Sequence, residues 1–144
     1  MSEKCSSIIL IKEIQTLEEK ILNHALRNQD ITLSQAKVLD FLLENPDHQA
    51  TLKHIEKGLN LSQSVTAGIV VRLEQKKYVV SFGDAADKRI KIVQITPLGE
   101  QRYLASQKVL GEQEEEALSA LTASEKEQFR TLLVKVKNAL QELE

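Results

Sequence analysis

The hydrophobic period in the middle of the chain changes from helical to extended, and this change constrains the fold most strongly. Thr51 and Ser62 each stand before an apolar pattern with helical spacing, which predicts two capped helices. Gly58 lies between the two caps, at a turn where we expect positive φ. Residues 78–82 and 90–95 are rich in β-branched and aromatic residues, which predicts a β-hairpin. This order of elements, two helices followed by a β-hairpin, is that of a helix-turn-helix followed by a wing.

Amphipathic helices are predicted on both sides of this region. Residues 7–27 carry apolar side chains at steps of four and three, and Ser34 is expected to cap a short helix over residues 36–43. Pro97, after a cap at Thr96, opens a helix that runs to about residue 118. A capping box, Thr122 to Glu125, precedes a last helix with a heptad-like apolar seam. The striped helices at the two ends are expected to pack on each other or on a second copy of the chain, and their reach favours a dimer.

The predicted fold class is therefore mainly α (α+β), a winged helix-turn-helix with long terminal helices that form a dimerisation region. We expect residues 1–32 to form an N-terminal dimerisation helix, residues 33–96 the DNA-binding domain, and residues 97–144 C-terminal dimerisation helices.

Composition limits the cellular compartment and the chemical class of the ligand. The 144 residues contain one cysteine, Cys5, so an intramolecular disulfide is excluded and a reducing cytoplasm fits best. No apolar run is long enough for a membrane span, so no membrane association is expected. The net charge is −2, yet residues 51–96 hold eight basic and four acidic side chains. This segregation fits a surface that meets an anion, although chance clustering of solvated charges explains it as well.

Catalytic and metal-binding motifs are not found. The five glycines are too widely spaced for a phosphate-binding loop, and no Gly-x-Ser-x-Gly motif occurs. The three histidines, His24, His48 and His54, do not have the spacing of metal ligands. We therefore expect no enzymatic activity, no cofactor and no metal.

The helix after Ser62 is the candidate recognition helix. Val65, Ile69 and Leu73 recur at steps of four and are expected to face the core. Polar and small side chains in the first turns are expected to meet DNA. Ser62 would bind phosphate at the helix N-terminus, Gln63 would pair with adenine, Ser64 and Thr66 would contact bases or phosphates, and Ala67 would touch a thymine methyl group.

The tip of the hairpin supplies further cations. In Asp87-Lys88-Arg89, the arginine suits insertion into a narrow minor groove, and Asp87 is expected to support it. Arg72 and Lys76 add charge within reach of phosphates. Aromatic residues make up 3% of the chain, too few for base-stacking platforms, so duplex DNA is the expected partner.

The sequence over about residues 33–105 resembles the MarR family of winged-helix transcriptional regulators. The most specific part is Asp87-x-Arg89 followed by Thr96-x-x-Gly99. The other matching segments are Leu33-Ser34-Gln35, Thr51, Leu61-Ser62-Gln63-Ser64-Val65-Thr66, Arg72-Leu73-Glu74 and Asp84-Ala85-Ala86.

The resemblance implies a homodimer with interdigitated terminal helices, bound to a pseudo-palindromic operator and acting as a repressor. It places residues 62–76 in the major groove and Arg89 in the minor groove. It also implies control by a small molecule or an oxidant at the junction between the dimer helices and the DNA-binding lobe.

Two alternatives use the same fold. Gly68 and Ser81 stand where family members usually carry polar or basic side chains, which leaves room for a dimeric winged-helix protein-interaction module without specific DNA binding. The other alternative is a protein whose function is to bind a small molecule. Cys5 reads as an ordinary thiol near the terminus, although some family members sense oxidants through an N-terminal cysteine.

Overall fold

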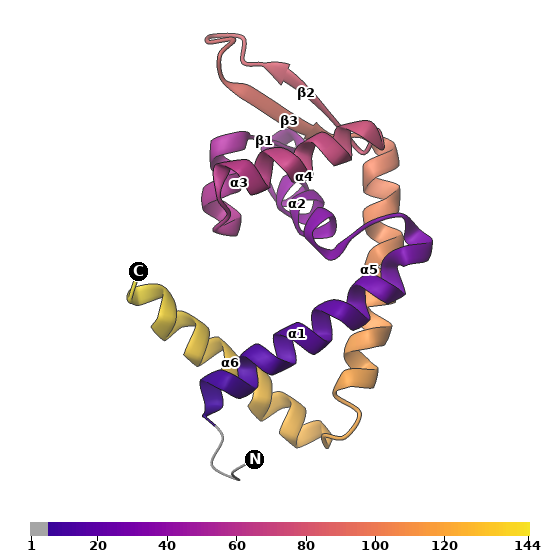
Figure 1. Cartoon of the computed structure of the whole chain (residues 1–144), viewed down its shortest axis with the longest axis vertical. Helices are drawn as coiled ribbons and strands as arrows, with labels where there is room; N and C mark the ends of the chain where they lie inside the picture. The colour runs from indigo at the N-terminus through magenta and orange to yellow at the C-terminus, as the bar shows by residue number, and fades with distance from the viewer. Residues whose placement is uncertain (1–5) are drawn as a thin grey trace. The chain divides into compact units, whose positions relative to one another are not determined.

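A computed structural model describes residues 6–144, which form two compact units. The first unit ends at Leu110 and contains the helix-turn-helix and a small sheet, and the second is Gly111–Glu144 (Figure 1). The predicted winged-helix fold is confirmed. In chain order the elements are α1 (Ser7–Leu26), the 3-10 turn η1 (Arg27–Gln29), α2 (Leu33–Glu44), the 3-10 turn η2 (Pro46–His48), β1 (Gln49–Thr51), α3 (Leu52–Leu59), α4 (Gln63–Gln75), β2 (Val79–Gly83), β3 (Lys91–Ile95), α5 (Pro97–Ala117) and α6 (Ala123–Glu142).

Four of the predicted helix caps are confirmed, among them Thr96, whose hydroxyl accepts a hydrogen bond from the Gly99 amide at 3.0 Å. The hydroxyl of Thr51 accepts a hydrogen bond from the His54 amide at 3.1 Å, and that of Ser62 accepts one from the Val65 amide at 3.2 Å. Thr122 forms a full capping box at the start of α6. Each cap satisfies an amide that the helix itself leaves without an acceptor.

The predicted cap of α2 at Ser34 is wrong. The cap is Thr32, which accepts from the Gln35 amide while the Gln35 side chain accepts from the Thr32 amide at 3.1 Å. This reciprocal pair satisfies two amides, whereas Ser34 lies inside the first turn of the helix.

The turn between α3 and α4 also differs from the expectation. Asn60, and not Gly58, adopts the left-handed backbone, with φ of 54°. Gly58 lies inside α3 beneath the ring of Phe41, and a Cβ atom there would collide with that ring. The glycine is thus explained by close packing of α3 against α2, while asparagine ends the helix.

The sheet has three strands, one more than the predicted hairpin. All pairs are antiparallel, and β3 lies between β1 and β2, with Ala50 and Ser81 both paired with Val93. Strand β1 has only three residues, too few to produce an alternating pattern in the sequence. Its addition anchors the base of the wing beside the helix-turn-helix.

The core of the first unit lies between α2, α4 and the sheet. Val38, Leu39 and Leu42 of α2 are fully buried together with Leu73 of α4 and Val93 of β3. Burial of side chains of this size stabilises the fold by about 1.5–3 kcal/mol each. The recognition helix is thereby fixed on a rigid support.

Helices α1 and α6 each keep an apolar stripe exposed. On α1 the exposed stripe includes Ile14, Leu17 and Ile21, and on α6 it includes Leu133 and Leu140. Apolar rows of this length on soluble helices are typical of association surfaces.

Across the described residues, no helix combines the length and the hydropathy needed to cross a membrane.

Candidate nucleic-acid interface

The N-terminal turn of α4 presents short polar side chains to solvent. Ser62, Gln63 and Ser64 are all exposed, and the hydroxyl groups of Ser62 and Ser64 lie 3.4 Å apart. The amides at this end carry the positive pole of the helix dipole, which attracts phosphate oxygens. The structure therefore brings these three predicted contact residues together on one surface, and their roles stay predictions.

Thr66 does not belong to this surface. Its side chain is fully buried, and its hydroxyl donates to the carbonyl of Ser62 at 2.9 Å. The expectation that Thr66 contacts bases or phosphates is therefore corrected: it packs between α4 and the core.

The side chain of Val65 faces solvent and not the core. We predicted that it faces inward, but it is 49% exposed. The buried residues of α4 are Thr66, Val70 and Leu73, so Leu73 faces the core as predicted and Ile69 packs partly buried against it, while Thr66 takes the place expected of Val65. A threonine whose hydroxyl is satisfied within its own helix packs like a valine, which the apolar pattern alone does not reveal.

The middle of α4 has an open surface with little side-chain bulk. Gly68 is exposed, and a Cβ atom built on it would meet nothing within 4 Å. Ala67 beside it is half-buried, and Arg72, one turn further, is exposed. Backbone at Gly68 is therefore accessible to a partner that approaches this face closely.

The tip of the wing is ordered by two aspartates. Asp84 accepts hydrogen bonds from the amides of Ala86 and Asp87, both at 3.1 Å. Asp87 accepts from the amide of Arg89 and from its guanidinium Nε, each at 3.1 Å. These Arg89 hydrogen bonds hold the pKa of Asp87 below its usual value.

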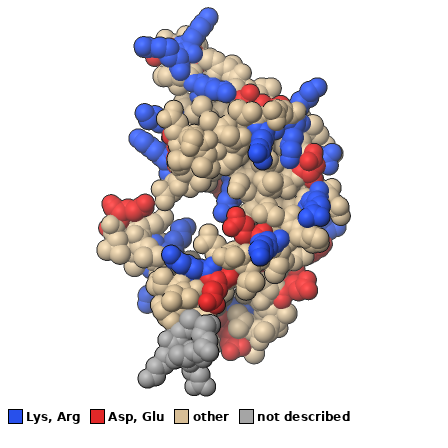
Figure 2. Space-filling model, in the orientation of Figure 1, with Lys and Arg blue, Asp and Glu red and all other residues tan. Residues whose placement is uncertain are grey.

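Arg89 itself projects into solvent. Its side chain is 91% exposed, and Lys88 next to it is also exposed. Figure 2 shows Lys and Arg side chains gathered at this end of the molecule. The predicted contact between Asp87 and Arg89 is present as a two-point pair, in which Nε donates to Oδ1 at 3.1 Å and Nη2 donates to Oδ2 at 3.2 Å.

Lys76 is withdrawn from the surface on which it was expected. Its ammonium group donates to Gln35 Oε1 at 2.9 Å and to the Asp30 carbonyl at 3.0 Å, and its side chain is 26% exposed. The expected phosphate contact is not brought together with the other cations. Sequence reasoning could not find this because Asp30 lies 46 residues away along the chain.

Glu74 is a residue that sequence reasoning missed. Its carboxylate accepts from the Ser81 hydroxyl at 2.6 Å and pairs with Lys91 at 3.0 Å. The Ser81 hydrogen bond is the main cause of a lowered pKa at Glu74, and Lys91 adds to it. The pair ties the end of α4 to both strands of the wing, so the two predicted DNA-contact elements are joined.

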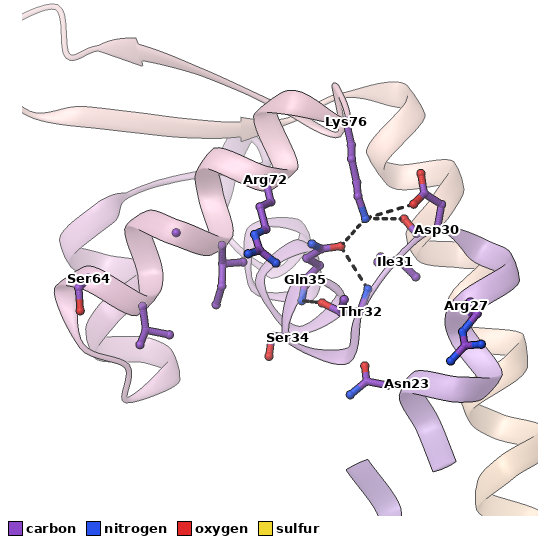
Figure 3. Close-up of a pocket in the computed structure, with 13 residues that line it drawn as sticks. Asn23, Arg27, Asp30, Ile31, Thr32, Ser34, Gln35, Ser64, Arg72 and Lys76 are labelled. Atoms are coloured by element: carbon purple, nitrogen blue, oxygen red, sulfur yellow. Dashed lines mark hydrogen bonds and ion pairs between the residues drawn. The ribbon is translucent and has the colours of Figure 1, made fainter. Parts of the chain in front are cut away.

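A cleft of about 610 Å³ opens beside α4 within the first unit. Figure 3 shows polar side chains from α1, α2 and α4 directed toward it. The lining includes three cations, Arg27, Arg72 and Lys76, with Asp30 as its acid, and apolar contacts come from Val65, Ile69 and Ile31. No group of three or more metal-ligating side chains occurs among residues 6–144.

The fold and this surface define a winged-helix DNA-binding protein. The model of the MarR family matches residues 29–90. The transcriptional regulator HosA of Escherichia coli O127:H6 is 30% identical over 132 residues, which cover 88% of this chain and 96% of HosA. The HTH-type transcriptional regulator YxaD of Bacillus subtilis is 31% identical over 90 residues, 62% of this chain, and the chain matches 63% of the length of YxaD.

Solved structures agree with the sequence relatives. A mutant MarR from E. coli complexed with operator DNA superposes with a TM-score of 0.78 at 27% identity, covering 88% of this chain and 90% of that one. The chain belongs to the MarR family of transcriptional regulators, and it is a regulator rather than an enzyme.

Proposed function

We propose that this protein is a homodimeric, sequence-specific regulator that binds a pseudo-palindromic operator and represses transcription. The observation that carries the proposal is the pairing of two contact elements on one lobe. The exposed first turn of α4 presents Gln63 and Ser64, and the wing presents Arg89 with a side chain 91% exposed. A helix of this kind fits the major groove and a tip arginine fits the minor groove.

The second copy of the chain follows from geometry and from the exposed stripes. A single recognition helix reads one half-site, so a palindromic operator requires two lobes related by a two-fold axis. The exposed apolar rows on α1 and α6 supply surface for that association. In this proposal residues 1–32 and 97–144 hold the dimer and residues 33–96 read DNA.

The cleft beside α4 supports control by a small molecule. Its lining carries three cations, one of them paired with the single acid Asp30, beside three apolar residues, which favours an anion over a cation. Because Ser64 and Arg72 of α4 also line it, a bound compound meets the recognition helix directly. A panel of small carboxylates, assayed by release of operator DNA, tests this part. Cys5, which an oxidant would require, lies outside the described residues.

The experiment for the DNA-binding proposal replaces the wing arginine. Arg89→Ala is expected to weaken operator binding at least tenfold, because both a charge and a groove contact are lost. Arg89→Lys is the matched control, since it keeps the charge and loses the planar, two-point geometry. Fluorescence anisotropy at several salt concentrations measures the affinity, and sedimentation confirms that the variants keep the oligomeric state of the parent.

Unchanged affinity of Arg89→Ala at every salt concentration would refute the assigned role. Binding that random duplex removes completely would instead support the interaction module.

A further inference from the structure

The ammonium group of Lys76 is held by acceptors of its own chain. It lies 2.9 Å from Gln35 Oε1, 3.0 Å from the Asp30 carbonyl oxygen and 3.3 Å from Asp30 Oδ1. An ammonium group has three donor hydrogens, and three acceptors surround it. Two of these hydrogens are donated in hydrogen bonds, to Gln35 and to the Asp30 carbonyl, and the Asp30 carboxylate pairs with the charge, so a DNA phosphate would have to compete with three contacts already made.

Tyr78 completes the cluster. Its hydroxyl donates to the same Asp30 carbonyl at 3.0 Å, and Lys76 Nζ lies 5.7 Å from the centre of its ring. We call these four residues, Lys76, Asp30, Gln35 and Tyr78, the latch. Figure 3 shows Lys76 reaching from α4 to Asp30 and Gln35.

The latch joins three segments that are distant in sequence. Asp30 follows η1, in the connection between α1 and α2, and its backbone is left-handed with φ of 53°. Gln35 belongs to the capping box of α2, and Lys76 follows the last turn of α4. Gln35 Oε1 accepts hydrogen bonds from both the Thr32 amide and Lys76, so this one oxygen atom connects the start of α2 to the end of α4.

We propose that Lys76 is a positioning residue that locks the end of the recognition helix to the connection between α1 and α2, and that it makes no contact with DNA phosphate. The proposal rests on the proposed operator binding and deepens it. A displacement of α1 is then transmitted to α4 through Asp30. The latch residues Lys76, Asp30 and Gln35 also line the cleft, so an occupant of the cleft lies against them.

Salt dependence separates the two roles of the lysine. Each phosphate contact that a cation makes adds about 0.9 to the slope of log affinity against log salt. Lys76→Met is expected to lower operator affinity about tenfold with the slope of the parent protein. Lys88→Met, at the exposed wing tip, is the matched control and is expected to lower the slope by about one.

The Asp30→Asn variant provides a second test, because the two roles of Lys76 predict opposite changes in operator affinity. Asparagine tolerates the left-handed backbone, so the fold is kept while the carboxylate charge is removed. If Lys76 only binds phosphate, loss of this acid frees the lysine and raises operator affinity. If the latch positions α4, affinity falls, and Lys76→Met then costs less in the Asp30→Asn background than in the parent.

Three outcomes overturn the proposal: a slope lowered by about one in Lys76→Met, equal losses in the two backgrounds, or no loss of affinity at all. If Lys76→Met does not fold, the sign of the Asp30→Asn effect decides alone. A parent protein that prefers operator no more than random duplex refutes the proposed function instead. The latch is then tested by amide hydrogen exchange at residues 72–78, which is expected to accelerate in Asp30→Asn and, if unchanged, refutes the latch as well.

Discussion

Lys77 illustrates how a single backbone angle determines where α4 ends. Its φ is 64°, in the left-handed region that costs a residue with a Cβ atom roughly 1 kcal/mol. The amide of Tyr78, the next residue, donates to the carbonyl of Leu73 at 2.9 Å, which closes the helix before β2 begins. A glycine would adopt this conformation without strain.

We therefore predict that Lys77→Gly raises the free energy of unfolding by about 1 kcal/mol. Lys77→Ala is the matched control, because it removes the same charge and keeps the Cβ atom, and it is expected to give no gain. Urea denaturation followed by circular dichroism measures both. Equal stability of the two variants would show that the angle stores no strain.

Among the elements, local sequence signals predicted where helices begin, whereas contacts with distant residues determine which face of a helix is buried. The cap at Ser62 predicted the start of α4 correctly, because the capping residue lies next to the helix it caps. The face of α4 was predicted wrong at its start, where Thr66 and not Val65 is buried, since Thr66 counts as polar in the sequence although its hydroxyl is satisfied locally.

The candidate site divides in the same way between local and distant interactions. The Asp87–Arg89 pair spans two residues and could be expected from the motif. The burial of Lys76 depends on Asp30, and β1 depends on pairing with β3 more than forty residues later, so neither was expected.

A partly buried hydrogen bond joins α5 to α2. The hydroxyl of Tyr103 donates to Asp40, and burial raises the pKa of Tyr103, with the Asp40 carboxylate raising it further. A raised pKa in the folded state means that the folded chain keeps a proton that the unfolded chain loses near pH 10. The stabilisation is thus complete below pH 10 and is lost as the pH rises above it.

We predict that Tyr103→Phe is less stable than the parent at pH 8, where the hydrogen bond to Asp40 is lost. Its free energy of unfolding is expected to fall less steeply between pH 8 and pH 11. Urea denaturation at the two pH values measures both slopes, and Tyr78 supplies part of the remaining slope because its pKa is also raised, mainly by burial. Parallel pH profiles would contradict the assignment.

For the whole molecule, the proposed reading of a palindromic operator requires two chains. Helix α6 has no buried residue, and its stripe of Leu133, Val136 and Leu140 is open to solvent. Exposed apolar rows of this kind gain about 25 cal/mol for each Å² that association removes from water. The stripe thus favours a state in which a second copy covers it.

We predict that Leu140→Glu shifts the protein from dimer to monomer and weakens operator binding, since one lobe reads only half of a palindrome. Asn138→Glu, on the opposite face of α6, introduces the same charge and is expected to leave the dimer intact. Sedimentation velocity over a range of concentrations distinguishes the two. A parent protein that is monomeric at every concentration would contradict the dimer.

Specific operator binding is tested by a fluorescence-anisotropy titration of the parent protein. The probe is the intergenic DNA next to its own gene, with random duplex as competitor, at two salt concentrations. We predict tight binding that resists the competitor, weakens steeply with salt and saturates at two chains per site. Binding that random duplex abolishes, or none in either salt, would contradict it.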